Sequence, residues 1–158
     1  MDLDIATRAA ALIGVLATAV VYGTDVFCAM VLRPALAAVP DDAVVAVMGY
    51  VHRYGDRRMP VPGVLGVVGT ATTTALAVVA SHWAQTAAAG IALVALLIWL
   101  VLYTRVSAPI NRQLTAAADA GNALPDVRSL QRKWDSIIGT RAALQSMAVA
   151  ALYVVLMT

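Results

Sequence analysis

The sequence contains no glutamate, one lysine, one phenylalanine and one cysteine. Charged residues make up only 13% of the chain, against about 25% in an average soluble domain. Such a composition excludes an intrinsically disordered chain, and a net charge of only +2 gives no support to nucleic-acid binding. The lone Cys28 excludes an intrachain disulfide framework and a cysteine-rich metal site. It lies in an apolar run, which favours a small buried side chain over a reactive thiol.

What the chain does have is apolar sequence. Hydrophobic residues make up 61% of its 158 residues, and the mean hydropathy is +0.82. A water-soluble domain of this length could not bury so much apolar surface in one core. We therefore expect an all-α integral membrane protein with a lipid bilayer as its solvent. A membrane-crossing helix needs about 20 mostly apolar residues, and four stretches qualify. The expected spans are 9–32, 61–81, 86–104 and 137–157, which together form one transmembrane four-helix bundle over residues 1–158.

The basic residues are distributed unevenly about these spans. Ten of the eleven fall in or near the two long connections, and only Arg8 falls on the other side. Cytoplasmic loops carry an excess of lysine and arginine. The pattern therefore predicts a multi-pass plasma membrane protein with both long connections in the cytoplasm and both termini outside.

Both long connections contain short helical patterns. After Pro40, apolar side chains recur at helical spacing as far as about Gly55, which predicts a short amphipathic helix at the inner membrane interface. In the second connection, Ser107 resembles an N-cap and Pro109 an early helical proline, which predicts a short helix over 109–119. The chain from 126 onward is expected to run without interruption into the fourth span.

Asp25 is the most informative residue. It lies eight positions before Arg33 and therefore about 12 Å from that end of the first span. An ionisable side chain inside a span is a functional candidate by default. Arg141, near the start of the fourth span, is its natural partner, and Arg58 at the mouth of the second span is another. The alternatives are a purely structural ion pair and a neutral Asp25.

Three further residues are candidates on the cytoplasmic side. His52 could act as a general base, since its ordinary pKa lies near neutral pH, although an exposed interfacial histidine fits the same pattern. His82 lies in the outer turn, so the two histidines cannot share a metal ion, and no metal site is expected. Asn111 follows the third span, and Trp134 precedes Arg141 by two helical turns, on the same face. An interfacial tryptophan and a capping amide are the alternative interpretations.

The order of these residues resembles a family. Arg33-Pro34-Ala35-Leu36 follows the first span and Met59-Pro60 precedes the second. Pro109-Ile110-Asn111 with Leu114 follows the third span, and Trp134-x6-Arg141 enters the fourth. This series is similar to that of small four-helix membrane proteins of unknown function related to anthrone oxygenases. The resemblance implies oxidation of a phenolic, anthrone-like carbon to a quinone with O2, without a conventional cofactor. It also implies site roles for Asn111, Trp134 and Arg141.

Such a reaction needs a base to ionise the aromatic substrate and a cation to stabilise the anion that forms. Asp25 or His52 could be the base, and Arg141 or Arg58 the cation. The competing hypothesis is a non-catalytic membrane protein that binds a lipophilic ligand or a partner subunit. A cavity on which Asp25, Asn111 and Arg141 converge would favour an enzyme or a ligand binder, whereas a filled core would favour a scaffold. The sequence leaves a homo-oligomer open.

Overall fold

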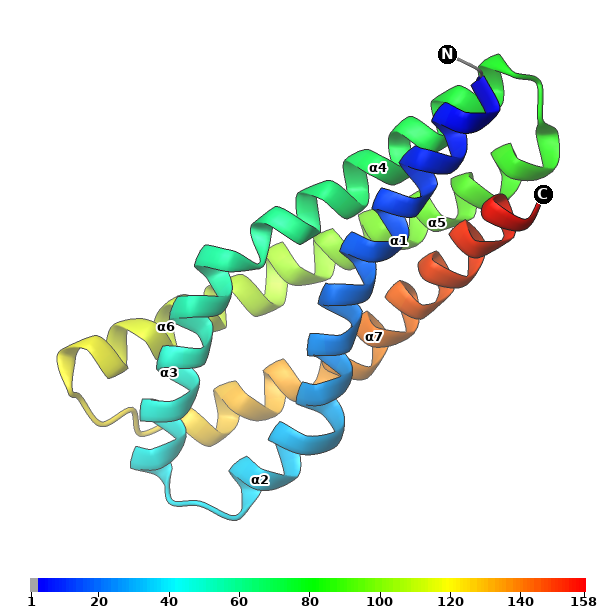
Figure 1. Ribbon diagram of the computed structural model, residues 1–158. Helices are drawn as coiled ribbons and strands as arrows, with labels where there is room; N and C mark the ends of the chain where they lie inside the picture. The colour runs from blue at the N-terminus through cyan, green and yellow to red at the C-terminus, as the bar shows by residue number, and fades with distance from the viewer. Residues whose placement is uncertain (1–2) are drawn as a thin grey trace.

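The computed structural model describes residues 3–158, and this part of the chain contains helices and no strands (Figure 1). In chain order the elements are α1 (Leu3–Phe27), the π-helical segment η1 (Cys28–Leu32), α2 (Arg33–Ala37), α3 (Asp41–Arg58), α4 (Pro60–Val79), α5 (Trp83–Leu102), the π-helical segment η2 (Tyr103–Ser107), α6 (Ala108–Ala120) and α7 (Val127–Met157). Four of the helical stretches are long and apolar enough to cross a membrane. The prediction of an all-α chain with four candidate spans is therefore confirmed.

Two of these stretches are longer than the sequence predicted. The first runs from Leu3 to Ala37 and the third from Trp83 to Ala120, instead of ending near residues 32 and 104. The helix predicted over 109–119 is present as α6, but its separation from the third span is wrong, because α6 continues α5 through η2. Ser107 is accordingly not an N-cap; it is buried inside the continuous helix. The first connection does contain a helix, α3, which ends at Arg58 rather than near Gly55.

Proline explains why both continuous helices contain a π-helical turn. Pro34 and Pro109 lie in the first turn of α2 and α6, directly after η1 and η2. A proline has no N–H, and its ring collides with the carbonyl four residues earlier. The preceding amides of Arg33 and Ala108 instead bond to carbonyls five residues back, those of Cys28 and Tyr103. This wider turn lets the helix continue through the proline.

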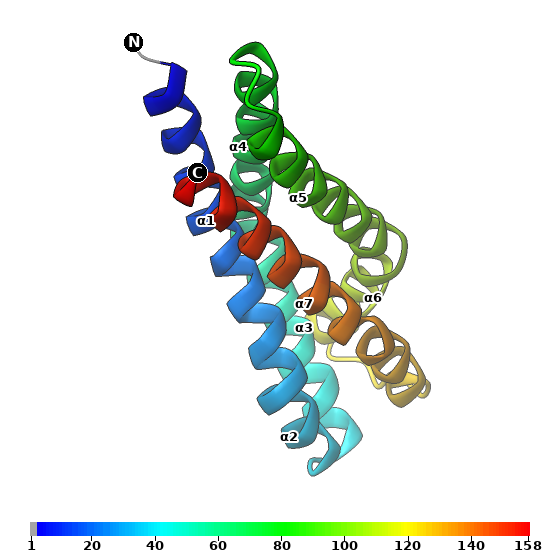
Figure 2. The same cartoon turned by 90° about the vertical axis from the view of Figure 1, so that its right-hand side faces the viewer.

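The long helices lie side by side in a ring. α1 packs against α4 and α7, and α5 packs against the same two helices (Figures 1 and 2). Small residues allow α1 and α4 to approach closely, as is typical of helix contacts in membranes. A Cβ added to Gly69 would lie 3.0 Å from the backbone nitrogen of Gly14. α1 begins and α7 ends at the same end of the molecule as the α4–α5 turn.

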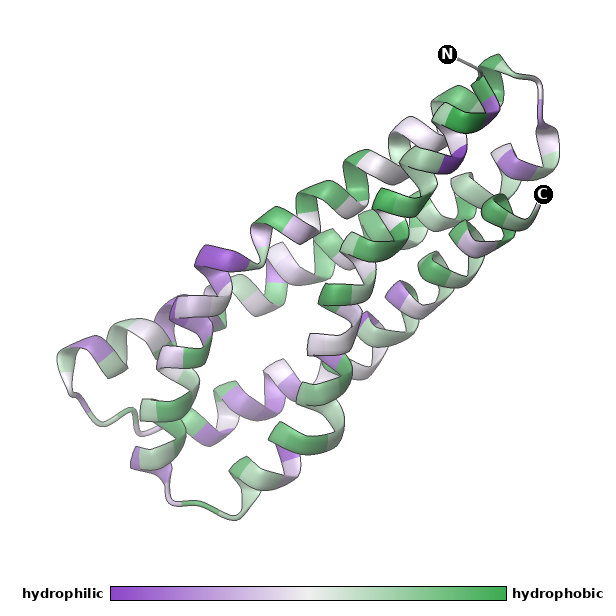
Figure 3. Ribbon diagram, viewed as in Figure 1, coloured by the Kyte–Doolittle hydropathy of each residue, from purple (hydrophilic) through white to green (hydrophobic). Residues whose placement is uncertain are grey.

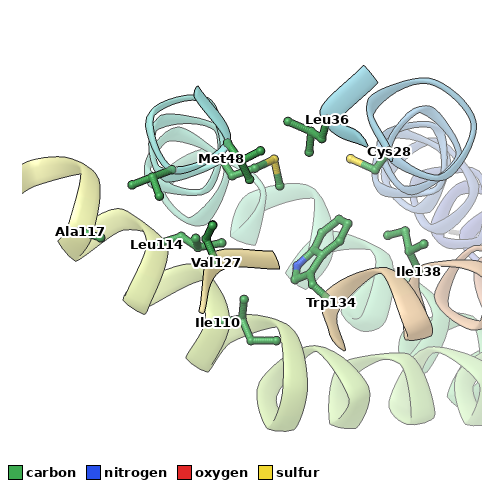
Figure 4. Close-up of a cluster of buried hydrophobic side chains, with 11 residues drawn as sticks. Cys28, Leu36, Met48, Ile110, Leu114, Ala117, Val127, Trp134 and Ile138 are labelled. Atoms are coloured by element: carbon green, nitrogen blue, oxygen red, sulfur yellow. The ribbon is translucent and has the colours of Figure 1, made fainter. Parts of the chain in front are cut away.

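The opposite end of the molecule holds the connections. There α3 packs against α6, and hydrophilic residues gather around α3, α6 and the first half of α7 (Figure 3). A cluster of buried hydrophobic side chains joins these elements to η1 and α2 (Figure 4). Trp134 of α7 lies in this cluster with Met48 of α3, Cys28 of η1 and Ile138. The cluster fixes the connections against the ends of the long helices and so shapes the site described next.

Along the ring of helices, large apolar side chains point outward. They include Val20 of α1, Val64 and Val68 of α4, and Ile91 and Val94 of α5, each more than half exposed. In water this exposure would be unfavourable over so large an area. In hydrocarbon it is the expected surface of a membrane-spanning helix.

Candidate functional site

A cavity of about 310 Å³ lies among the long helices, at the end of the ring that meets α3. Its volume falls within the range of about 300–1,000 Å³ that is typical of small-molecule sites. Most of its wall is apolar, and a small set of polar and aromatic side chains interrupts it. That set comprises Thr24, Asp25, His52, Asp56, Trp99, Tyr103, Asn111, Trp134 and Arg141. Asp25, Asn111 and Arg141 therefore converge on one cavity, and the core at this level is not filled.

The predicted pairing of Asp25 with Arg141 is present. An Nη2–H of Arg141 donates to Oδ1 of Asp25 at 2.8 Å, and the two side chains are only 6% and 4% exposed. Gln145 donates to the other carboxylate oxygen at 2.6 Å. Nη1 of Arg141 donates to the hydroxyl oxygen of Ser107 at 2.7 Å. The carboxylate and the guanidinium thus compensate each other, as buried charges require.

Three aromatic rings surround the Arg141 guanidinium. Its central carbon lies 6.0 Å from the ring centre of Trp99, 5.7 Å from that of Tyr103 and 5.8 Å from that of Trp134. Rings at such distances attract a cation through their quadrupole. They come from α5, η2 and α7, so the cation lies at the meeting point of three elements.

A hydrogen-bonded chain closes the side of the cavity next to α6. The indole N–H of Trp134 donates to Asn111 Oδ1 at 3.1 Å. The Asn111 amide donates to Asp56 Oδ1 at 2.8 Å. The Tyr103 hydroxyl donates to the same oxygen at 2.9 Å. Asn111 is therefore a side-chain bridge between α7 and α3 rather than a helix cap, and it holds Trp134 in place.

His52 is buried on the cavity wall. Its ring centre lies 5.5 Å from that of Trp134, and its Nε2 atom has no hydrogen-bond partner within the described part of the chain. Burial lowers the pKa of His52 to about 4, although the nearby Asp56 carboxylate opposes the change. The imidazole is consequently neutral at pH 7. The alternative of an exposed interfacial histidine is wrong, because α3 turns this face toward the core.

Five of the six predicted site residues line the cavity, and Arg58 does not. Arg58 is exposed near the end of α3, with its guanidinium 5.4 Å from the ring centre of Tyr54. The arginine therefore lies on the outer surface, where it does not reach Asp25. His82 lies in the α4–α5 turn, at the other end of the molecule.

Five residues that sequence reasoning missed complete the site: Ser107, Asp56, Trp99, Tyr103 and Gln145. Gln145 had a detectable signal, because it follows Arg141 by four residues and so shares a helix face with a predicted site residue. Trp99 and Tyr103 share a helix face with each other, but neither is four residues from a predicted site residue. Asp56 had no such signal, because it stands among other charged residues in the first connection. Ser107 was interpreted as a cap.

No family model, curated protein or solved structure matches this chain. What the site can do chemically therefore rests on its own residues. Within residues 3–158, no three His, Cys, Asp or Glu side chains are grouped as they would be to hold a metal ion. The polar groups available to a ligand are a neutral imidazole with an unpartnered Nε2 and the buried guanidinium, whose Nε also has no partner among the described residues. The first can accept a proton and the second can stabilise an anion.

Proposed function

We propose that this chain is a membrane-embedded four-helix bundle that oxidises a phenolic or anthrone-type aromatic substrate with O2, without a conventional cofactor. The observation that carries the proposal is that the unpartnered imidazole of His52 and the buried guanidinium of Arg141 belong to one mostly apolar cavity. The first supplies a base and the second a fixed positive charge. Trp99, Tyr103 and Trp134 supply flat surfaces against which an aromatic substrate can stack.

In the proposed reaction, His52 Nε2 removes a proton from the activated methylene carbon of an anthrone or from its enol tautomer. The resulting anion gives one electron to O2, and the radical pair combines to form a C–O bond. The peroxide anion then takes back the proton held by His52 and becomes a hydroperoxide. The hydroperoxide then loses the second hydrogen of the same carbon together with hydroxide. One O2 is consumed, one oxygen atom enters the quinone, and the other leaves as water.

Each candidate residue has a role in this scheme. Arg141 stabilises the substrate anion, and Asp25 holds the guanidinium in position. We assign the base to His52 rather than Asp25, because both carboxylate oxygens of Asp25 already accept hydrogen bonds, whereas His52 Nε2 has no partner among the described residues. Asn111 fixes the Trp134 ring, which bounds the cavity. Arg58, which lies outside the cavity, has no role.

The placement in the membrane follows from helix length and charge. α4 has 20 residues and is therefore about 30 Å long, which matches the hydrocarbon core of a bilayer. We place the α3–α6 end in the cytoplasm and both termini outside, in the plasma membrane, because ten of the eleven basic residues lie in or near the two long connections. The cavity is lined in part by exposed side chains, Val51, Val64 and Val68. This rim suits a lipophilic substrate that enters from the bilayer.

The test uses the purified chain in lipid nanodiscs with an anthrone. One molecule of quinone, measured by its absorbance, should form for each molecule of O2 consumed. His52→Gln should lower kcat at least about 100-fold, as expected for loss of a general base. Arg141→Lys and Asp25→Asn should also reduce the rate, whereas Arg58→Gln should not change it. Unchanged rates in the His52, Asp25 and Arg141 variants would eliminate the proposed roles.

A second candidate function is non-catalytic binding of a lipophilic ligand, favoured by the mostly apolar lining of the same cavity. The same samples separate the two functions. An aromatic compound that quenches the fluorescence of Trp99 and Trp134 saturably, with no O2 consumption, would support binding without catalysis.

A further inference from the structure

A second cavity opens on the far side of α3, between this helix and α6. Its volume is about 330 Å³, and it is a wide groove rather than an enclosed pocket. Unlike the first cavity, it is lined mainly by charged side chains. These are Arg53, Asp56, Arg57, Arg112 and Asp119, with the hydroxyl of Thr115 between them. The proposed oxidation uses none of the three arginines.

The charges in the groove do not balance. Arg53 pairs with Asp119 at 3.0 Å. Oδ1 of Asp56 already accepts two hydrogen bonds from the neighbouring site. No salt bridge within 4.0 Å is formed by Arg57 or Arg112 in the described part of the chain. Arg57 and Arg112 thus have no salt-bridge partner, and three arginines against two aspartates leave the groove with a net charge of +1.

The remaining polar group of the groove does not compete for these arginines. The Thr115 hydroxyl donates to the backbone carbonyl of Gly49 at 3.2 Å, so its proton is already engaged. The free donors in the groove are therefore the guanidinium N–H groups. Their planar fork fits the oxygens of a phosphate group better than it fits a spherical anion.

The position of the groove indicates where such a phosphate would come from. Arg57 precedes the first residue of α4, Pro60, by three positions, or about 4.5 Å of helix. If α4 crosses the hydrocarbon core, Arg57 lies at the level of the lipid headgroups, which extend roughly 5–8 Å beyond it. On the outward face of α3, Tyr50 and Tyr54 are about half exposed. Tyrosine is enriched at this level of a membrane.

We propose that the α3–α6 groove binds the phosphate group of an anionic phospholipid through Arg57 and Arg112. Basic pockets on the cytoplasmic side of membrane proteins are suited to such headgroups. The site uses the proposed membrane placement and does not depend on the proposed catalysis. A bound lipid would hold α3 against α6, and the single negative charge of its phosphate group would compensate the net positive charge of the groove.

The experiment titrates the purified chain, in an uncharged detergent, with three probes. These are dioctanoyl phosphatidylglycerol, dioctanoylglycerol, which lacks the phosphate, and inorganic phosphate. Native mass spectrometry counts the bound molecules, and the shift in melting temperature gives the affinity. We expect one phosphatidylglycerol to bind, with no binding of dioctanoylglycerol and much weaker binding of inorganic phosphate. The double variant R57Q/R112Q should bind the lipid at least tenfold more weakly.

The matched control is R132Q/K133Q, which removes the same two positive charges from exposed positions on α7 outside the groove. Its affinity should stay within twofold of that of the unaltered chain. Equal losses in the two double variants would overturn the site, since they would report diffuse charge attraction. Equal affinities for phosphatidylglycerol and inorganic phosphate would overturn the lipid as the source. Should R57Q/R112Q fail to fold, R57K/R112K keeps the charge and removes the forked donors, and unchanged affinity in that variant would overturn the role of the guanidinium groups.

Discussion

At the scale of single residues, the Asp25–Arg141 pair is the most demanding feature of the molecule. Two charges buried to this extent are stable only because each has two hydrogen-bond partners, which come from α1, η2 and α7. Removing one member of such a pair typically costs about 3–5 kcal/mol, because the other charge is left uncompensated. The pair therefore also fixes the register of α1 against α7, since a shift by one residue would separate the two groups.

His52 makes a pH-dependent contribution to stability. Its pKa is about 4 in the folded chain, because burial disfavours the charged imidazole, and about 6.5 in an unfolded one. Between pH 6.5 and pH 4 the unfolded chain therefore binds a proton that the folded chain does not bind. We expect the free energy of unfolding to fall by about 3 kcal/mol between pH 6.5 and pH 4 through this residue.

The measurement is denaturant unfolding in detergent across this pH range. In the His52→Gln variant, the free energy of unfolding should no longer fall by this amount between pH 6.5 and pH 4. The His82→Gln variant, which alters the histidine at the other end of the molecule, should show the same fall as the unaltered chain. Identical pH profiles for His52→Gln and the unaltered chain would contradict the assignment.

At the scale of elements, the two π-helical turns show how local chemistry extends a helix. Pro34 and Pro109 would each be expected to interrupt a helix, and the sequence predicts helix boundaries near both. Instead, the amide of the residue before each proline donates to the carbonyl oxygen five residues earlier, and the helix continues. In the third stretch this turn contains Ser107, whose buried hydroxyl accepts a hydrogen bond from Arg141. The wider turn thus places a site residue as well as accommodating the proline.

The contact between α3 and α6 depends on Gly49. A Cβ at this position would lie 2.3 Å from the Cβ of Ala118 and 2.7 Å from the carbonyl oxygen of Leu114. Because backbone cannot move away as a flexible side chain can, we expect Gly49→Ala to lower the free energy of unfolding by about 1–3 kcal/mol. Thermal unfolding in detergent measures this change.

Gly139 of α7 is the matched control, since a Cβ added there meets nothing within 4 Å. Gly139→Ala should leave stability unchanged or raise it by up to about 1 kcal/mol, because alanine is the better helix former. A Gly49→Ala variant as stable as Gly139→Ala would show that α3 and α6 can separate without cost.

At the scale of the whole molecule, surface character changes from one end to the other. The ring of long helices exposes valine, leucine and isoleucine, whereas charged side chains gather around α3, α6 and the start of α7. The cavity with His52 and Arg141 lies between these two regions, next to the first turn of α4. A ligand there would therefore be within reach of hydrocarbon, while the polar network of Asp56 separates it from the charged groove.

Cysteine labelling tests the proposed orientation. In a Cys28→Ser background, His82→Cys should react with a membrane-impermeant maleimide on intact cells, because the α4–α5 turn is placed outside. Asn122→Cys, in the loop between α6 and α7, should react only after the membrane is permeabilised. Both residues are exposed in the structure, so burial cannot explain a difference, and the reverse labelling pattern would overturn the orientation.

Hydropathy predicted the four candidate spans, and the position of a single acid in the first of them predicted its partner in the last. The same reasoning could not find Asp56, because nothing in a run of charged residues marks the one that turns inward. It also kept Arg58 as a second candidate partner beside Arg141. Which of two arginines reaches a buried carboxylate depends on how α3 is rotated, and that rotation is set by its contact with α6.

The sequence by itself determined that the chain is helical and apolar enough for a bilayer, since hydropathy and helical spacing are properties of neighbouring residues. It also indicated that Asp25 must either have a cationic partner or be neutral, because a lone charge in hydrocarbon is unstable whatever the fold. Only the tertiary structure decided that His52 is buried beside Trp134, that Asn111 links α7 to α3, and that a cavity remains among them. Those features arise where faces of distant helices meet, and the spacing of residues along one helix carries no information about the shape of the gap between several.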